Sequence, residues 1–390
     1  MLHTTTAVFF LGLACTTLLA DTNAAPLNCW QTTRTNPTFF PIGVWLQSPP
    51  NAKAYRDAGI NTFVGLWEGP TDSQLAELYA AEMLIVCGQN QLALQHTARS
   101  NILAWMHGDE PDNSSTRGAR LGFGQPVPVE NIVADYRTMK SADATRPVLL
   151  NLGQGVAWDN WYGRGERNRH PEDYPPYLEG CDIASFDIYP VTHPDVEVAG
   201  NLWYVPRGLE RLRGWVRDEK PVWNFIETTR GFNQKRKPTP SEVRAEVWMS
   251  LIHGSRGIVY FAHQFKPVFI EAGMLEDAAM LSEVTRLNQQ ITTLAPVLNS
   301  ASISNAVSVR PSNSGAPIAS MVKRVGGFSY IFSVAMRPLE TNVEFVLNQS
   351  EGSEPVEVLG EGRTVSMQNG KFTDAFGPWG IHLYRVKTSP

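Results

Sequence analysis

The sequence has few cysteines and no excess of basic charge. It contains 4 Cys in 390 residues, and 33 Lys and Arg against 38 Asp and Glu give a formal net charge of −5 at pH 7. So few cysteines exclude a scaffold built on disulfides, and no Cys or His spacing matches a structural zinc site. A net negative chain lacks the broad cationic surface that holds a phosphate backbone. Nucleic acid is therefore not expected as a partner, and no metal or organic cofactor is implied.

Long apolar runs are also scarce. The run from Ala7 to Ala20 is too short to span a bilayer and is followed by small residues up to Ala25, which is typical of a cleaved secretory signal. We predict a signal peptide over residues 1–25, a secreted protein, and no membrane span. Removing this segment leaves three cysteines, so at most one disulfide forms. Cys87 and Cys181 lie in apolar runs and are expected to be small buried hydrophobes.

No Gly-rich phosphate loop follows the first predicted strand, which disfavours a dinucleotide-binding sheet. From residue 39 onward short β-branched or aromatic runs alternate with helical patterns, and this alternation predicts a (β/α)8 barrel over residues 26–298, in the α/β class. The expected helices are Asp72–Glu82, Val129–Ala142, Pro206–Asp218, Ser241–His253 (capped by the Ser241 hydroxyl and ended by Gly254) and Asp277–Leu294. The expected strands are Phe39–Gln47, Thr62–Trp67, Leu84–Gly88, Ile102–His107, Val148–Leu152, Ile183–Tyr189, Val222–Glu227 and Ile258–Phe261.

The last part of the chain has a different pattern. After Pro296 short alternating runs are separated by Gly, Pro, Asn and Ser, which predicts a small antiparallel β-sandwich domain over residues 299–390. No low-complexity linker precedes it, so we expect the sandwich to pack directly on the barrel. The clearest strand candidates are Ser329–Ala335, Asn342–Leu347, Val356–Leu359 and Gly380–Val386.

Two glutamates follow apolar strand residues, where an unpaired charge is costly. The fourth strand ends His107-Gly108-Asp109-Glu110-Pro111, and the seventh ends Phe225-Ile226-Glu227-Thr228-Thr229. Active sites of such barrels lie at the carboxyl ends of the strands, and strands four and seven face each other across the barrel. Retaining cleavage of a glycoside needs one protonated and one ionised carboxyl group on the two sides of the sugar. We therefore predict that Glu110 is the general acid/base and Glu227 the nucleophile.

These residues carry a family resemblance. The region from Phe39 to Leu298 resembles glycoside hydrolase clan A, whose acid/base and nucleophile glutamates end strands four and seven. The resemblance includes Asp187-Ile188-Tyr189-Pro190, where clan members often place a Tyr that hydrogen-bonds the nucleophile, and the entry to strand eight, Gly254-Ser255-Arg256-Gly257-Ile258-Val259-Tyr260-Phe261. It implies a retaining β-glycosidase that acts on an oligo- or polysaccharide, and a terminal sandwich is a common accessory in the clan.

One residue departs from the clan pattern. Clan members usually have Asn before the acid/base, and this chain has Asp109. An ionised Asp109 raises the pKa of Glu110, which suits a general acid. An Asp-Glu pair also occurs in N-acetylhexosaminidases that use the acetamido group of the substrate as nucleophile, so that mechanism is a first alternative. A catalytically silent barrel that only binds carbohydrate is a second.

Sugar rings pack on aromatic faces, and their hydroxyl groups seek polar neighbours. The loop after strand five is long and without clear regular structure, so we predict that its aromatic residues are functional. Its arginines, Arg164 among them, are expected to form a solvated and partly paired surface. The predicted substrate-binding residues are Asp109, Tyr189, Trp67, Glu68, Asn151, Trp158, Trp161 and His263.

Overall fold

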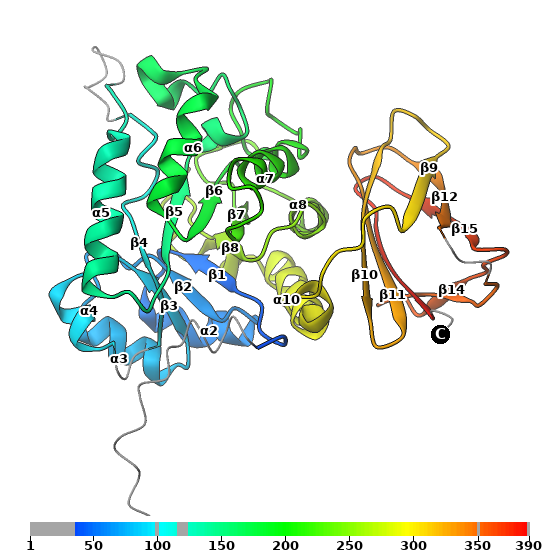
Figure 1. Cartoon of the computed structure of the whole chain (residues 1–390), viewed down its shortest axis with the longest axis horizontal. Coiled ribbons are helices and arrows are strands. Elements are labelled where there is room, and N and C mark those ends of the chain that lie inside the picture. Colours follow the sequence, from blue (N-terminus) through cyan, green and yellow to red (C-terminus); the bar gives the residue numbers. More distant parts are fainter. Residues whose placement is uncertain (1–35, 98–100, 115–123, 349–351, 388–390) are drawn as a thin grey trace, which may run out of the picture.

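The computed structural model describes residues 36–97, 101–114, 124–348 and 352–387, so the predicted signal peptide lies outside the described residues. Eight parallel strands close into a barrel in chain order (Figure 1). The strands are β1 (Ile42–Trp45), β2 (Thr62–Val64), β3 (Leu84–Cys87), β4 (Ile102–Met106), β5 (Val148–Leu152), β6 (Ile183–Phe186), β7 (Val222–Glu227) and β8 (Ile258–Phe261). The predicted barrel is confirmed.

The barrel strands are apolar because both of their faces are covered. One set of side chains fills the barrel interior, including Trp45, Leu103 and Phe225. The other set packs against the surrounding helices. Such strands read as continuous hydrophobic runs. Cys87 and Cys181 belong to this buried material as free thiols, as predicted.

Helices surround the barrel, and they are α2 (Ala52–Asp57), α3 (Asp72–Ala80), α4 (Gln91–Gln95), α5 (Val129–Ala142), α6 (Tyr174–Tyr177), α7 (Tyr204–Trp215), α8 (Pro240–Ile252), α9 (Gly273–Glu276) and α10 (Ala278–Leu298). The predicted cap of α8 is wrong. Thr239, not Ser241, precedes the helix and accepts from the N–H of Glu242, whose carboxylate accepts from the N–H of Thr239. Pro240 then occupies the first turn, where no N–H is needed. Gly254 has φ +94° and ends α8 as predicted.

The segment between β5 and β6 is more regular than its sequence suggested. It forms α6 and four short 3-10 helices, Gln154–Val156, Tyr162–Arg167, Pro171–Asp173 and Leu178–Gly180. Its aromatic residues do not follow one continuous helical period, so the sequence pattern does not indicate these short turns. Trp158, Tyr174 and Tyr177 pack together with the outer side of β5 and β6 in a hydrophobic cluster of their own. The loop is thus a packed part of the barrel wall.

The C-terminal part is a β-sandwich. A five-stranded sheet has the order β10-β11-β16-β13-β14, and a three-stranded sheet has the order β15-β12-β9. The strands are β9 (Val307–Pro311), β10 (Ile318–Val325), β11 (Phe328–Ala335), β12 (Thr341–Leu347), β13 (Val356–Val358), β14 (Arg363–Val365), β15 (Lys371–Phe376) and β16 (Ile381–Lys387). Stacked rings of Phe345 and Phe372, 4.7 Å apart, lie in the core between the sheets.

The five-stranded sheet also packs on the barrel, beside α8 and α10 (Figure 1). Residues of β11 alternate between the two interfaces: Ile331 points into the sandwich, whereas Phe332 and Val334 join the barrel cluster. The ring centroids of Phe332 and Trp248 of α8 lie 5.5 Å apart. Because both faces of this sheet are buried, the sandwich is packed directly against the barrel, as expected from the lack of a linker.

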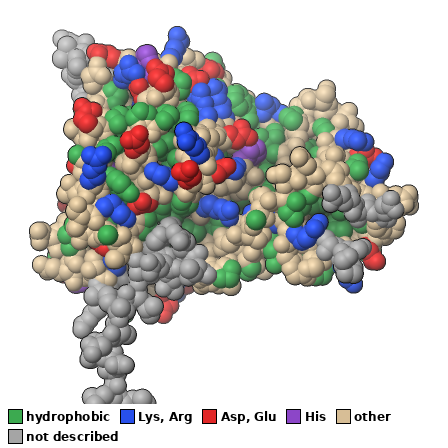
Figure 2. Space-filling model, in the orientation of Figure 1, with side chains coloured by type: hydrophobic (Ala, Val, Ile, Leu, Met, Phe, Trp, Pro, Cys, Tyr) green, Lys and Arg blue, Asp and Glu red, His purple; other side chains and the backbone are tan. Residues whose placement is uncertain are grey.

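The surface carries both signs of charge. On the face drawn in Figure 2, acidic and basic side chains are interspersed rather than gathered in one large field of a single sign. Among the described residues, no helix combines the length and the hydropathy needed to cross a bilayer. In the same residues, no group of three or more His, Cys, Asp or Glu side chains has the geometry to hold a metal ion.

Candidate active site

A cavity of about 500 Å³ opens at the carboxyl ends of the barrel strands. Glu110 and Glu227 both face it. The other lining residues are Trp45, Asp109, Gln154, Trp161, Tyr162, Asp187, Tyr189, Thr192, His193, Pro194, Thr229, Gly231, Phe232, Phe261 and Phe265. Two larger cavities of about 600 and 870 Å³ lie near the amino ends of β7 and of β5, where residues such as Pro147, Pro221 and Arg256 line them. Of these three cavities, only the one of about 500 Å³ is lined by both Glu110 and Glu227.

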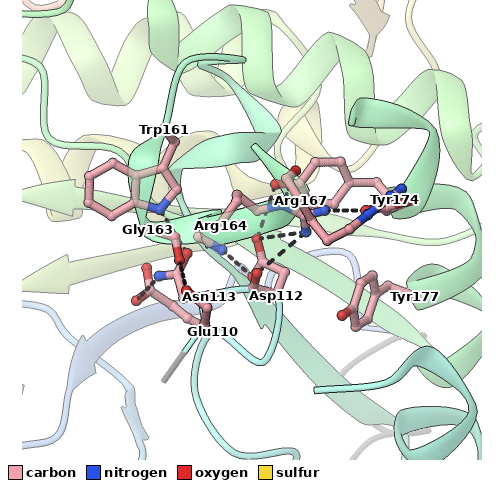
Figure 3. A network of polar contacts seen from close by, with 12 residues as sticks. Glu110, Asp112, Asn113, Trp161, Gly163, Arg164, Arg167, Tyr174 and Tyr177 are labelled. Atoms are coloured by element: carbon pink, nitrogen blue, oxygen red, sulfur yellow. Dashed lines mark hydrogen bonds and ion pairs between the residues drawn. The ribbon is translucent and has the colours of Figure 1, made fainter. Parts of the chain in front are cut away.

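Glu110 lies just beyond the end of β4, at a sharp turn. Its φ of +44° places the residue in the left-handed region, which costs a non-glycine residue free energy and is common at functional sites. The amide of Asn113 donates to Glu110 Oε2 at 2.8 Å, and the indole N–H of Trp161 donates to Asn113 Oδ1 at 2.7 Å. Trp161 therefore orients the Asn113 amide so that its nitrogen faces the carboxyl group of Glu110 (Figure 3).

Burial raises the pKa of Glu110 well above its usual range, and the negative charge of Asp187 and a hydrogen bond to it raise the pKa further. Asp187 follows β6 and is itself buried, which raises its pKa, while the nearby side chains of Glu110 and Tyr189 oppose that rise. The burial of Glu110 and the charge of the neighbouring Asp187 both favour the protonated form of Glu110. Asp187 was not predicted as a site residue, although it follows an apolar strand as Glu110 does and that signal could have revealed it.

Asp109 completes a group of three carboxyl groups. The amide of Asn151 on β5 donates to Asp109 Oδ1 at 2.9 Å. The pKa of Asp109 is raised to about 7, first by loss of solvation between the cavity walls and then by the charge of Asp187. Asp109 nevertheless keeps an open surface toward the cavity, so water screens part of this effect. Asn151, predicted to bind substrate, is 2 % exposed and does not line the cavity, so it reaches the site only through Asp109.

Asp109→Asn is expected to stabilise the protein at pH 8 and not at pH 4. In the unfolded chain Asp109 loses its proton near its usual pKa of 3.8, whereas the folded protein holds the proton until about pH 7. The free energy of unfolding therefore falls as the pH rises through this window. We expect a gain of about 1 kcal/mol for the variant at pH 8, less than the full shift implies because the carboxyl group is partly exposed.

Urea denaturation at the two pH values measures this difference. Asp57→Asn is the matched control, because Asp57 is an exposed carboxylate paired with Lys53 at 2.6 Å and its pKa is lowered rather than raised. The control should therefore show no gain at pH 8. Equal stability of Asp109→Asn and the unsubstituted protein at pH 8 contradicts the prediction.

Glu227 ends β7 and is 2 % exposed. The backbone N–H of Val191 donates to its Oε1 at 2.6 Å, and that of Thr192 donates to its Oε2 at 3.0 Å. Burial raises its pKa to about 7, and the hydrogen bonds from Thr192 and Val191 oppose this rise. The resemblance implied a Tyr–nucleophile bond, but the Tyr189 hydroxyl approaches Asp187 instead, and two backbone N–H groups take the place of that bond at Glu227.

A buried ion network lies beside Glu110 and Asn113 (Figure 3). The fully buried Asp112 accepts from the N–H of Gly153 at 2.8 Å and from the hydroxyl of Tyr174 at 3.0 Å, and Arg164 lies 3.8 Å from it. Arg164 also donates to Asp173 at 2.5 Å and is 2 % exposed. The expectation that Arg164 belongs to a solvated surface is therefore wrong. The network ties the turn after β4 to the loop after β5 and so holds Glu110 in place.

Of the other predicted binding residues, some line the cavity and others do not. Trp161 and Tyr189 line the cavity. Trp158 is 2 % exposed and packs in the core, so it presents no ring face to a sugar. Trp67 is 69 % exposed, and neither it nor Glu68 lines the cavity. His263 is buried beside Gln47, with their nitrogens 3.2 Å apart.

Besides Asp187, two further polar residues of the cavity, Gln154 and His193, are not indicated by the sequence. The imidazole of His193 accepts from the N–H of Asp195 at Nδ1, so its Nε2 donates to Gln154 Oε1 at 2.7 Å. Burial lowers the pKa of His193, which favours the neutral ring. Both residues lie on loops with no distinctive local pattern, and only the folding of the loops after β5 and β6 brings them into the cavity.

The fold and the cavity define a (β/α)8 barrel with carboxyl groups at the ends of β4, β6 and β7. The chain shares 9 % identity with AmyP in complex with maltose, over 93 % of this chain and 99 % of that one, at a TM-score of 0.54. Similar values hold for an α-amylase from Geobacillus thermoleovorans complexed with acarbose (9 %, 90 % and 99 %, 0.55) and a putative α-galactosidase from Bacteroides fragilis (11 %, 90 % and 80 %, 0.56). The sequence matches no protein-family model and no curated protein. These likenesses show the fold, a barrel followed by a β-domain, which is the fold that the resemblance to clan A implies.

Proposed function

We propose that the protein is a secreted retaining β-glycoside hydrolase that cleaves an O-glycosidic bond by double displacement. The observation that carries this proposal is one cavity lined by both Glu110, just after β4, and Glu227, at the end of β7. The surroundings of Glu110 favour its protonated form, whereas two backbone N–H groups stabilise the anion of Glu227. The barrel architecture and the names of the structures that share it support the same class of activity. Secretion rests on the apolar segment from Ala7 to Ala20.

The two glutamates are suited to opposite roles. Glu110 faces Asp109 and Asp187, so ionising it places another negative charge among carboxylates. Glu227 accepts two backbone N–H groups, which stabilise its anion. When one of the pair is ionised, it is therefore Glu227. Two carboxyl groups whose environments separate their pKa values in this way can divide the work of acid and nucleophile.

In the proposed reaction a carboxylate oxygen of Glu227 attacks the anomeric carbon while Glu110 transfers its proton to the departing glycosidic oxygen. The bond to the leaving group breaks as the bond to Glu227 forms. Glu110, now ionised, then takes a proton from water, and that water attacks the anomeric carbon and releases Glu227. The product keeps the configuration of the substrate. Asp187 acts through Glu110, because its negative charge keeps the proton there before the first step.

The sugar at the cleavage site is proposed to lie against the polar wall formed by Asp109, Gln154 and His193, with the ring of Trp161 beside it. Pyranose hydroxyl groups need hydrogen-bonding partners when they leave water, and these side chains provide donors and acceptors. Asp109 occupies the place at which clan members usually contact the 2-hydroxyl group. A hydroxyl group there can donate to Asp109 Oδ2, since Asn151 already occupies Oδ1.

Hydrolysis of a panel of 4-nitrophenyl β-glycosides, with product configuration followed by NMR, tests the proposal. We expect release of 4-nitrophenol from at least one sugar and a first-formed product with retained β configuration. An α product contradicts the double displacement. Binding of sugars without release of reducing ends from either aryl glycosides or oligosaccharides supports the silent barrel instead.

A second candidate, hydrolysis assisted by the substrate's acetamido group, has one observation in its favour. Glu227 is almost fully buried, whereas Asp109 is open to the cavity beside Glu110. In that mechanism Asp109 would orient the acetamido group and Glu227 would take no chemical part. Turnover of N-acetylglucosaminides alone, with no cleavage of the matching glucosides, identifies this mechanism.

A further inference from the structure

A row of aromatic rings leads out of the cavity between β7 and β8. It begins at Phe261, whose ring centroid lies 5.0 Å from that of Tyr189, and continues to Phe265 at 6.2 Å. Phe265 stacks on Phe232 at 4.3 Å with the rings 2° from parallel, and its ring lies 5.6 Å from Phe269. We call Phe261, Phe265, Phe232 and Phe269 the phenylalanine row.

The outer end of this row is open to solvent. Phe232 is 71 % exposed and Phe269 is 58 % exposed, and the neighbouring Val268 is also exposed. Contiguous exposed apolar side chains mark interaction surfaces and ligand-binding grooves. Phe232, Phe261 and Phe265 also line the cavity, so the exposed patch is continuous with the carboxyl groups.

The main chain holds the row in position. The loops after β7 and β8 pair where Gly231 bridges Gln264, and the N–H of Phe265 donates to Gly231 O at 2.8 Å. The hydroxyl of Thr229 donates to the carbonyl of His263 at 2.5 Å. These bonds fix the two loops to each other before any ligand binds, so little conformational entropy is lost when the row is covered.

The row differs chemically from the polar wall of the cavity. Gln154, His193 and Asp109 offer hydrogen-bonding groups on that wall, whereas no side chain of the row can donate or accept a hydrogen bond. The rings of the row themselves would offer the hydroxyl groups of a sugar no hydrogen-bonding partner. An aryl ring or an alkyl chain loses nothing there and gains from leaving water.

We propose that the substrate is an amphipathic glycoside whose apolar aglycone, an aryl group or alkyl chain, lies on the phenylalanine row while its sugar occupies the polar wall. This inference rests on the proposed glycosidase function and names its substrate class. The sugar that carries the anomeric carbon needs the polar partners, so the departing group extends toward the row. Tyr189 lies near both Asp187 and Phe261, so it stands between the carboxyl groups and the phenylalanine row.

The test compares methyl and hexyl β-glycosides of glucose, galactose, xylose and N-acetylglucosamine. For the sugar that is cleaved, kcat/KM for the hexyl glycoside is expected to exceed that for the methyl glycoside about 30-fold, which corresponds to only part of the burial of five additional methylene groups. In Phe232→Ala and Phe269→Ala this ratio should fall to about 3. Tyr79→Ala is the matched control, because Tyr79 is 62 % exposed on α3 and remote from the row, and its ratio should stay at about 30.

A binding measurement separates failure of this inference from failure of the proposed function. Titration calorimetry with the same hexyl and methyl glycosides requires no turnover. Tighter binding of the hexyl glycosides that is lost in Phe232→Ala supports the row even if no glycoside is cleaved. Equal binding and equal kcat/KM for the two chain lengths overturn the inference, and better turnover of oligosaccharides than of hexyl glycosides does the same while leaving the glycosidase function intact.

Discussion

Replacing Glu227 with Gly is expected to lower kcat/KM by about 10⁵-fold, which corresponds to about 7 kcal/mol of lost transition-state stabilisation. The carboxylate of Glu227 is proposed to form the covalent bond that divides the reaction into two steps, and no other group on β7 can take its place. The two N–H groups of Val191 and Thr192 remain, but they only donate hydrogen bonds. They cannot replace the nucleophile.

Azide should restore turnover in Glu227→Gly. The glycine leaves a space beside the anomeric carbon, and a small anion can enter it and accept hydrogen bonds from the N–H groups that held the carboxylate. Attack by azide gives a glycosyl azide of inverted configuration, which NMR identifies. Assays with a 4-nitrophenyl glycoside isolate this step, since its leaving group needs little help from Glu110.

Glu246→Gln is the matched control for this experiment. Glu246 on α8 is also fully buried, and burial first and then the charge of Glu227 raise its pKa, but Glu246 does not line the cavity. Its substitution should change kcat/KM by less than about tenfold. Full activity of Glu227→Gly without azide ends the assignment of the nucleophile and favours the mechanism in which the acetamido group of the substrate attacks.

Glu110→Gln is expected to have an effect that depends on the leaving group. For an alkyl glycoside, whose departing oxygen needs a proton, kcat/KM should fall by about 10³-fold to 10⁴-fold. For a 4-nitrophenyl glycoside, whose oxygen leaves as a stable anion, the decrease should be about tenfold. The ratio between these two losses distinguishes a group that transfers a proton from one that only supports the fold.

The pH profile gives a second measurement of the same role. Burial and Asp187 raise the pKa of Glu110, so the proton needed for the first step is present at neutral pH and is lost as the pH rises through that raised pKa. In the unsubstituted protein kcat/KM should decrease on the alkaline side, and Glu110→Gln should lack this alkaline decrease for the 4-nitrophenyl glycoside. An unchanged alkaline limb in the variant shows that another group titrates there.

The sequence predicted the architecture well because the barrel depends on local patterns. Continuous apolar runs such as Ile102–Met106 and helical periodicity such as that of Val129–Ala142 are properties of adjacent residues, and each alternation adds one strand and one helix. The alternating faces of the terminal strands predicted the sandwich for the same reason. Errors occurred where patterns overlap: the hydroxyl at Ser241 resembles a cap as closely as the true cap at Thr239, and proline decides between them.

The sequence pointed to the two glutamates that line the cavity but not to most of the residues around them. Glu110 and Glu227 stand out because a charged residue close to the end of an apolar strand is costly unless a partner compensates it. The sequence does not distinguish the role of Trp158 from that of Trp161. In the structure Trp158 is buried, whereas Trp161 orients Asn113. Which of the two rings is buried depends on the path of the loop after β5. That path is set by contacts such as the one between Arg164 of the loop and Asp112.

The sequence by itself determined a barrel, a terminal sandwich and a pair of glutamates at opposing strand ends, since periodicity and the position of a residue within a strand are local properties. The tertiary structure alone decided the electrostatics and the shape of the cavity. Asp187 reaches Glu110, and two backbone N–H groups reach Glu227, only because closing the barrel brings the ends of β4, β6 and β7 around one space. The phenylalanine row likewise exists only because Gly231 and Gln264 pair across two loops, a contact that no local pattern contains.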